Sequence, residues 1–226
     1  MPPVPGIEPF SDISGDPAVR GFLHHPAASA GASLVLTHGA GGNSRSPLLV
    51  ALARAFAEAG FLVLRCDLPF RQARPKGSPY PATAAKDREG LHRALEAVRQ
   101  LQPGRAFLGG QSYGGRQATM LAAEKPGLAD GLLLLSYPLH PPGRPADLRV
   151  AHFPQLHTPL LFVHGSRDPF GSLEELRGAL RLIPARTTLL EIEGAGHGLA
   201  TAKSLNPELI TRILEAFRSF FQEPAV

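Results

Sequence analysis

The feature that most constrains the fold of this chain is a repeated alternation between short apolar runs and longer segments with helical periodicity. The apolar runs are rich in Val, Leu and Phe, as in "ASLVLTH" at 32–38 and "PLLFVHG" at 159–165. Continuous runs of this kind are typical of strands that are buried on both faces of a sheet. The segment at 83–101 instead repeats its apolar residues every three to four positions, which is typical of a helix. The alternation therefore predicts an α/β fold with a mainly parallel sheet and helices on both faces.

The pattern places seven strands and five helices along the chain. The expected strands are 18–26, 32–38, 61–68, 105–110, 131–137, 159–165 and 187–194. The expected helices are 46–60, 83–101, 116–125, 172–183 and 207–222. For the first helix we expect Ser46 as the N-cap, Pro47 at the first helical position and Gly60 as the stop signal.

The size of the chain fits one large domain better than two small ones. It has 226 residues, of which 43% are apolar, and this is enough to bury a substantial core. No internal repeat and no low-complexity linker interrupts it. We therefore expect a single domain over 1–226, with its core at about 18–222.

Charge and cysteine content exclude several classes of function. The formal net charge is +4, but the Lys and Arg residues are dispersed, so neither a nucleic-acid-binding arm nor a membrane-binding basic helix is indicated. The single cysteine, Cys66, cannot build a disulfide framework. The sequence shows no leader peptide, and "GLLLLSYPL" is too short to span a bilayer. We expect a cytoplasmic protein with no nucleic-acid or membrane partner, and the oligomeric state stays open.

Ser112 lies in a glycine-rich turn between the strand at 105–110 and the following helix. The stretch Gly110-Gln111-Ser112-Tyr113-Gly114 has the form G-x-S-x-G, and this strand-turn-helix setting is what a nucleophile elbow needs. Glycines flank such a serine because the strand and the helix approach too closely for side chains. We interpret Ser112 as a nucleophile; the alternative is a serine that caps the helix.

A serine nucleophile needs an imidazole as general base and a carboxylate that orients the imidazole. Asp168 in "HGSRDPFG" follows one strand end, and His197 in "GAGHGL" follows the last expected strand. The order serine, acid, histidine is the one that this kind of fold uses. Taken singly, Asp168 could be a turn aspartate before a proline and His197 a surface loop residue. Together with Ser112 they predict a catalytic triad.

The loop "HGAGGN" follows the strand at 32–38, where this kind of fold provides a backbone donor for an oxyanion. We expect the N–H groups of Ala40 and Tyr113 to form the oxyanion hole. A phosphate-binding loop is the alternative, but G-x-G-x-x-G is absent and no Lys-Ser/Thr pair follows.

These segments resemble the α/β-hydrolase superfamily over nearly the whole chain. The motifs "LVLTHGAGGN", "LGGQSYGGRQA", "YPLHPPGRP", "HGSRDPFG" and "GAGHGL" are similar to the dienelactone-hydrolase-like group that includes testis-expressed protein 30 and the third subunit of the NSL chromatin complex. The resemblance implies Ser112 as nucleophile, Asp168 as acid and His197 as base. Dienelactone hydrolases proper carry a cysteine at the elbow, a difference that argues against that particular activity.

The remaining reactive side chains indicate no cofactor and no metal. Cys66 has no elbow around it and is interpreted as a small buried residue. We expect His38 to support the oxyanion loop by hydrogen bonding. The other histidines show no metal-ligand spacing.

The segment 140–158 is short and broken by prolines, so we expect an open site without a lid or cap domain. Arg71 and Arg74 lie on a loop after a strand end, and Arg45, Arg116 and Arg144 lie near other strand ends. Arg71 and Arg74 are our candidates for binding an anionic group of the substrate, unless they are only a solvated rim.

The function expected from these observations is a cofactor-free serine hydrolase acting on small esters or thioesters through an acyl-enzyme. Peptidase or lactonase activity stays open, because a triad does not specify the acyl and leaving groups. The alternative from another class is an interaction module with this fold and little or no catalytic activity.

Overall fold

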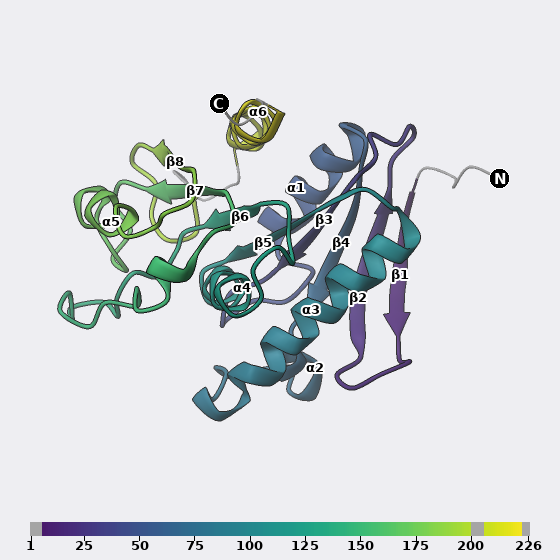
Figure 1. Cartoon of the computed structure of the whole chain (residues 1–226), viewed down its shortest axis with the longest axis horizontal. Coiled ribbons are helices and arrows are strands. Elements are labelled where there is room, and N and C mark those ends of the chain that lie inside the picture. Colours follow the sequence, from purple (N-terminus) through teal and green to yellow (C-terminus); the bar gives the residue numbers. More distant parts are fainter. Residues whose placement is uncertain (1–5, 200–205, 223–226) are drawn as a thin grey trace.

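The fold is described from a computed structural model of the chain, which describes residues 6–199 and 206–222. Eight strands form one sheet in the order β1-β2-β4-β3-β5-β6-β7-β8 (Figure 1). Their bounds are β1 Gly6–Asp12, β2 Val19–His25, β3 Ala32–Thr37, β4 Phe61–Asp67, β5 Arg105–Gln111, β6 Leu132–Leu135, β7 Leu160–Gly165 and β8 Thr187–Ile192. From β4 to β8 all neighbouring pairs are parallel, and the pairs of β2 with β1 and β4 are antiparallel. The prediction of a mainly parallel sheet is confirmed.

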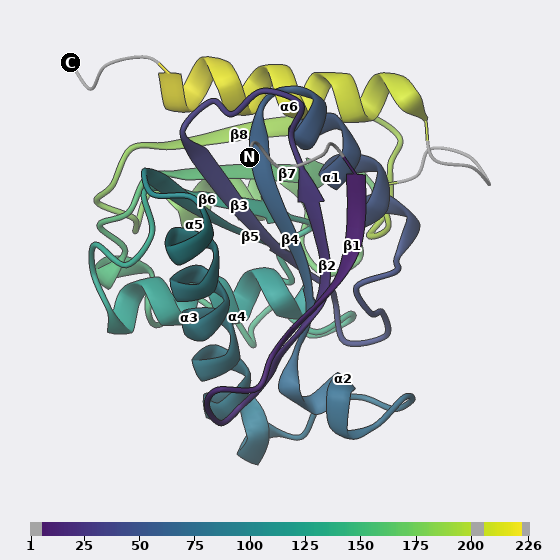
Figure 2. The same cartoon turned by 90° about the vertical axis from the view of Figure 1, so that its right-hand side faces the viewer.

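Helices connect the strands and cover both faces of the sheet. The α-helices are α1 Pro47–Glu58, α2 Pro69–Ala73, α3 Ala84–Leu101, α4 Tyr113–Glu124, α5 Leu173–Leu180 and α6 Pro207–Gln222, and short 3₁₀ helices lie at η1 Pro81–Thr83 and η2 Phe153–Gln155. Figure 2 shows α6 above the sheet and α3 and α4 below it. None of the helices in the described part of the chain is both long and apolar enough to cross a membrane.

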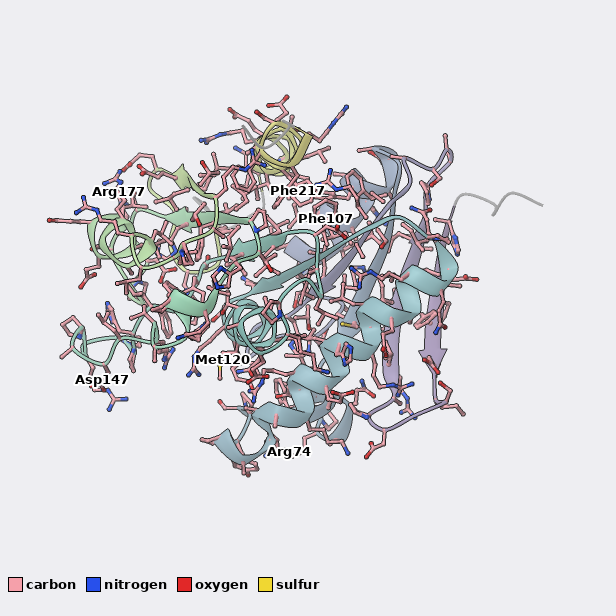
Figure 3. All side chains as sticks on the ribbon, viewed as in Figure 1. Arg74, Phe107, Met120, Asp147, Arg177 and Phe217 are labelled. Carbon is pink, nitrogen blue, oxygen red and sulfur yellow. The ribbon has the colours of Figure 1, made fainter. Side chains whose placement is uncertain are left out.

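Two apolar cores separate the sheet from its two helical layers. One core joins the sheet to α3, α4 and α5, and the other joins it to α1 and α6. In the second core, the Phe107 ring from β5 lies 4.9 Å from the Phe217 ring of α6, centre to centre (Figure 3). Each strand in the middle of the sheet therefore contacts apolar side chains on both faces, which explains its continuous hydrophobic sequence.

The structure differs from the sequence prediction in several elements, among them the short helix α2, which was not predicted. Strand β1 was not predicted, because its residues are mostly exposed, Pro9 stands within it and they form no continuous apolar run. Helix α4 begins at Tyr113 and not at 116, because the helix starts directly after the turn at Ser112. Ser46 stands at the N-cap position of α1 but makes no side-chain cap; its hydroxyl donates to the Asn43 carbonyl at 2.8 Å.

The carboxyl ends of the parallel strands lie at one edge of the sheet, and the connections there position the candidate site. Between β6 and β7 the described chain contains no helix other than the short 3₁₀ helix η2. The expectation of an architecture without a lid is confirmed. The predicted domain span, 1–226, extends at both ends beyond the described residues.

Candidate active site

Ser112 lies on a tight turn at the carboxyl end of β5, directly before α4. Its backbone angles are φ 49° and ψ −114°, a conformation that L-residues rarely adopt. A Cβ atom on Gly110 would lie 2.5 Å from the carbonyl carbon of Gly114, and one on Gly114 would lie 2.5 Å from the carbonyl oxygen of His38. Both positions therefore require glycine, and the turn pushes the Ser112 side chain away from the sheet.

The Ser112 hydroxyl is hydrogen-bonded to a histidine and does not cap the helix. Its Oγ lies 2.8 Å from His197 Nε2, and no side-chain cap bond is formed at the N-terminus of α4. On its other side, His197 Nδ1 lies 2.8 Å from Asp168 Oδ2 and 3.0 Å from Oδ1. A carboxylate can only accept here, so Nδ1 carries the proton and Nε2 is free to accept one from Ser112. The structure thus brings together the three residues that the sequence analysis selected.

Local contacts fix the orientation of the Asp168 and His197 side chains. The Phe170 N–H donates to Asp168 Oδ1 at 2.9 Å, so Asp168 also forms the turn that its sequence context suggested. The Asp168 side chain is fully buried and that of His197 is 24% exposed. The Phe170 ring stacks on the His197 imidazole, with ring centres 4.1 Å apart. The imidazole is therefore held between a buried carboxylate and the serine, with one edge open to solvent.

The loop after β3 brings Gly39 next to Ser112, and Ala40 lines the same cavity as Ser112. In the peptide group between Gly39 and Ala40, the carbonyl accepts from the Gly42 N–H at 3.0 Å and from His38 Nδ1 at 2.8 Å. The N–H and C=O of a trans peptide point in opposite directions, so fixing this carbonyl also fixes the direction of the Ala40 N–H. His38 Nε2 in turn accepts from the Leu68 N–H at 3.1 Å. His38 therefore supports this loop by hydrogen bonding, as expected.

Tyr113 provides the second expected donor, because it is the first residue of α4 and its N–H has no partner within the helix. In the described part of the chain, neither the Tyr113 nor the Ala40 N–H makes a backbone hydrogen bond. The positive end of the helix dipole adds to the attraction for an anion at this point. The Tyr113 hydroxyl donates to the buried Asp87 carboxylate at 2.7 Å, and burial raises the pKa of both groups. This hydrogen bond anchors the Tyr113 ring to α3, the helix that carries Asp87.

A cavity of about 370 Å³ opens beside Ser112. Its lining residues are Ala40, Ser78, Pro79, Tyr80, Pro81, Ala84, Ser112, Tyr113, Arg116, Gln117, Pro138, Arg149 and Phe170. Ser112 and both residues with the expected oxyanion donors contact this space. A volume of this size suits a small organic molecule.

The arginines that line the cavity are not the ones that the sequence analysis selected as substrate-binding residues. Arg71 is 7% exposed, and its guanidinium donates to the carbonyls of Gly42 at 2.9 Å and Ala40 at 2.7 Å. It also donates to the carbonyls of Arg74 and Gly77. Its donors are therefore directed at the oxyanion loop and the loop after α2, and the expected role in substrate binding is replaced by a structural one.

Arg74 donates to the Ser78 carbonyl at 2.8 Å and lies over the Tyr80 ring, 4.1 Å from its centre. It supports the rim of the cavity and is not among its lining residues. The cavity is lined instead by Arg116, which the sequence analysis noted near a strand end, and by Arg149, which it missed. One signal could have indicated Arg116, since it lies one helical turn after Ser112 and so on the same face of α4.

The other reactive side chains of the described residues have no place in this site. Cys66 is buried, and burial raises the pKa of its thiol to about 12, so the thiol is inert at neutral pH. Within residues 6–199 and 206–222, no cluster of three or more His, Cys, Asp and Glu side chains is arranged to hold a metal ion.

Comparison with known proteins identifies the family and the fold of the chain. The chain matches the family described as "Alpha/beta hydrolase domain" over residues 30–222. It is similar to the protein TT1662 from Thermus thermophilus, with 25% identity, a TM-score of 0.73 and coverage of 97% of this chain and 100% of that one. It is also similar to a dienelactone hydrolase from Anabaena variabilis, with 21% identity, a TM-score of 0.74 and coverage of 96% and 97%. A third similar structure, XC6422 from Xanthomonas campestris, is described as an α/β serine hydrolase without a lid; it has 17% identity, a TM-score of 0.74 and coverage of 97% and 96%.

Proposed function

Because this chain belongs to the alpha/beta hydrolase domain family, we propose that it is a serine hydrolase that cleaves small carboxylic esters or thioesters. The observation that carries the proposal is the hydrogen-bonded path from Ser112 Oγ through His197 to the buried Asp168 carboxylate, with 2.8 Å at both links. A scaffold protein has no physical need for a serine held in a rare backbone conformation against an imidazole and a carboxylate. The sequence motifs are also similar to those of the group that includes testis-expressed protein 30 and the third NSL subunit, and we propose that the chain is related to this group.

In the first half of the proposed reaction, Ser112 Oγ attacks the carbonyl carbon of the substrate while its proton passes to His197 Nε2. The carbonyl oxygen becomes an oxyanion, which the N–H groups of Ala40 and Tyr113 stabilise. Asp168 holds the imidazole in orientation and stabilises its positive charge. The tetrahedral intermediate collapses, the alcohol or thiol leaves with the proton from His197, and an acyl-Ser112 ester remains.

In the second half, a water molecule gives a proton to His197 Nε2 and attacks the acyl carbon. The same donors stabilise the second oxyanion, and its collapse releases the carboxylic acid and returns the proton to Ser112. No cofactor is required for either half. The cavity beside Ser112 has room for the acyl or the leaving part of a small substrate.

The proposal predicts that Ser112→Ala abolishes ester hydrolysis while the protein stays folded. We expect turnover of 4-nitrophenyl butyrate and of a butyryl thioester to fall by about three orders of magnitude or more, because the covalent route is lost. The matched control is Ser219→Ala on the exposed face of α6, which should leave turnover unchanged. Circular dichroism checks that both variants are folded. Equal turnover by folded Ser112→Ala and wild-type protein would contradict the proposal, and no turnover by the wild type would favour an interaction module.

A further inference from the structure

The cavity beside Ser112 carries an excess of positive charge. Two arginines, Arg116 from α4 and Arg149 from the segment after β6, are among its lining residues, and none of the described lining residues is Asp or Glu. Within the described residues neither guanidinium lies within 4.0 Å of a carboxylate. Asp147, the acidic residue nearest in sequence to Arg149, pairs with Arg144 at 3.3 Å on the outer part of the segment (Figure 3). The positive charge in the cavity is therefore not neutralised by those acidic groups.

Two of the lining residues, Arg116 and Gln117, each have a buried nitrogen atom without a hydrogen-bond partner among the described residues. These atoms are Arg116 Nε and Gln117 Nε2. The Gln117 side chain is fully buried, and its Oε1 accepts from Arg88 at 3.1 Å. Arg88 itself pairs with Glu124 at 2.9 Å, so it fixes the Gln117 amide with Nε2 as the unused donor. Buried donors are rarely left unpaired, because they lose their hydrogen bonds to water and gain none in exchange. The two donors indicate a missing acceptor.

Arg149 lines the cavity together with Arg116 and has no ionic partner within residues 6–199 and 206–222. Among the residues that the structure describes, its guanidinium donates to the Pro138 carbonyl alone, at a long 3.4 Å. Burial and the neighbouring charge of Arg116 lower the pKa of Arg149. Two guanidinium groups that repel each other in a partly buried cavity form a favourable place for a bound anion.

We infer that Arg116, Arg149 and Gln117 form a carboxylate-binding subsite, and that the preferred substrates are esters or thioesters with a carboxylate a few bonds from the scissile carbonyl. The inference rests on the proposed function, because the scissile carbonyl is placed by Ser112. Arg116 lies four residues after Ser112 on α4, a rise of roughly 6 Å along the helix. A planar carboxylate can accept parallel hydrogen bonds from a guanidinium, and the Gln117 amide offers a third donor.

The rest of the lining limits the polarity and the length of the segment that joins the ester to the carboxylate in such a substrate. It is mainly apolar and includes the rings of Pro79, Tyr80, Pro81, Pro138 and Phe170. The cavity volume of about 370 Å³ is at the lower end of the range typical of small-molecule sites. A short aliphatic spacer between the ester and the carboxylate fits this space.

The test compares two 4-nitrophenyl esters that differ at one end of the acyl chain, where one has a carboxylate and the other has its neutral methyl ester. Mono-4-nitrophenyl adipate carries a carboxylate at the end of its acyl chain, and its methyl ester has the same chain without the charge. We expect Arg116→Met and Arg149→Met each to lower kcat/KM for the charged ester by about ten- to hundredfold, because a charge-assisted hydrogen bond is lost. The neutral ester should change by less than about threefold, because Met keeps the length of the apolar stem. Turnover by Ser112→Ala serves as the blank.

Arg144→Met is the matched control, because Arg144 is an exposed arginine of the same segment and is not among the lining residues. It should leave the ratio of the two rates unchanged. If Arg116→Met or Arg149→Met does not fold, the Lys variant replaces it. Lys keeps the charge without the planar fork, so it should give an intermediate ratio.

The two hypotheses fail in different ways. If the wild type hydrolyses both esters equally through Ser112, the serine hydrolase assignment holds and the carboxylate subsite is wrong. If it hydrolyses neither, calorimetry of monomethyl adipate with Ser112→Ala protein decides, because this measurement needs no turnover. Saturable binding that weakens about tenfold or more in Arg116→Met supports the subsite. Absence of binding, or equal binding by both proteins, overturns it.

Discussion

At the residue scale, the backbone of Ser112 is compensated by hydrogen bonds on both sides. The Ser112 N–H donates to the Leu135 carbonyl at 2.8 Å and the Ser112 carbonyl accepts from the Arg116 N–H at 2.9 Å. A residue at φ 49° costs of order 1–3 kcal/mol, so it persists only where its surroundings define it this strongly. Because these bonds fix the backbone of the turn, the Ser112 hydroxyl is held within hydrogen-bonding distance of His197. In a similar way, hydrogen bonds from Arg71 to the carbonyls of Ala40 and Gly42 fix the backbone of the oxyanion loop.

The buried guanidinium of Arg71 predicts a large stability effect. Replacing Arg71 by Met removes the donor for the Ala40 and Gly42 carbonyls, which are then left unpaired in a partly buried loop. We expect the free energy of unfolding to fall by about 1–3 kcal/mol, measured by urea denaturation. Arg74→Met is the control and should cost less, because its contacts lie on the exposed rim. Equal losses in the two variants would contradict a structural role for Arg71.

At the element scale, β5, the turn at Ser112 and α4 act as one unit. The sequence predicts this unit well, because an apolar run, a glycine cluster and a helical period follow one another directly. The hydrogen bond from Ser46 to the Asn43 carbonyl and the presence of strand β1 could not be predicted. Whether a serine at an N-cap position bonds to the helix or to the preceding loop depends on rotamers, and β1 is defined by pairing with β2 and not by its own apolar pattern.

Two glycine substitutions should have opposite effects. Gly110→Ala places a Cβ atom 2.5 Å from α4 backbone, so we expect severe loss of stability or no folded protein. Gly178→Ala lies on the exposed face of α5 with no atom within 4 Å of the new methyl group. It should raise the free energy of unfolding by up to about 1 kcal/mol, because alanine favours a helix over glycine. Thermal and urea unfolding measure both. A stable, fully folded Gly110→Ala protein would be inconsistent with the close approach of β5 and α4.

At the scale of the whole molecule, the sheet brings together residues that lie far apart in the sequence. Ser112 and His197 are 85 positions apart, and their pairing could be predicted because both follow strand ends of a parallel sheet. The arginines of the cavity could not be selected in the same way. Arg149 lies in a segment without periodicity, and the direction of the Arg71 side chain depends on carbonyls of a loop 29–31 positions away.

Stability should also depend on pH through His24, which joins β2 to β4. His24 is 1% exposed and its Nε2 accepts from Arg65 at 2.8 Å. Burial, and next the charge of Arg65, lower the pKa of His24 from 6.5 to about 4. Between these values the unfolded chain binds the proton and the folded protein does not, so stability falls as the pH is lowered from 6.5 toward 4. Burial also lowers the pKa of His152 to about 4, with the same sign.

The variant His24→Gln tests this prediction, because glutamine keeps an acceptor for Arg65 but cannot be protonated. We expect its free energy of unfolding, measured in urea at several pH values, to decline less steeply below pH 6.5 than that of the wild type. His157→Gln, at an exposed position, should follow the wild-type curve. Parallel curves for His24→Gln and the wild type would show that His24 does not contribute.

The most direct test of the central claim is covalent labelling with a fluorophosphonate probe, read by mass spectrometry of the intact protein and its peptides. An activated serine displaces fluoride from phosphorus, so the account predicts one probe molecule per chain, attached to Ser112. Labelling should be absent in Ser112→Ala and much slower in His197→Ala, which lacks the base that accepts the serine proton. A wild-type protein that is folded but carries no probe on Ser112, or carries it only on another residue, would contradict the account.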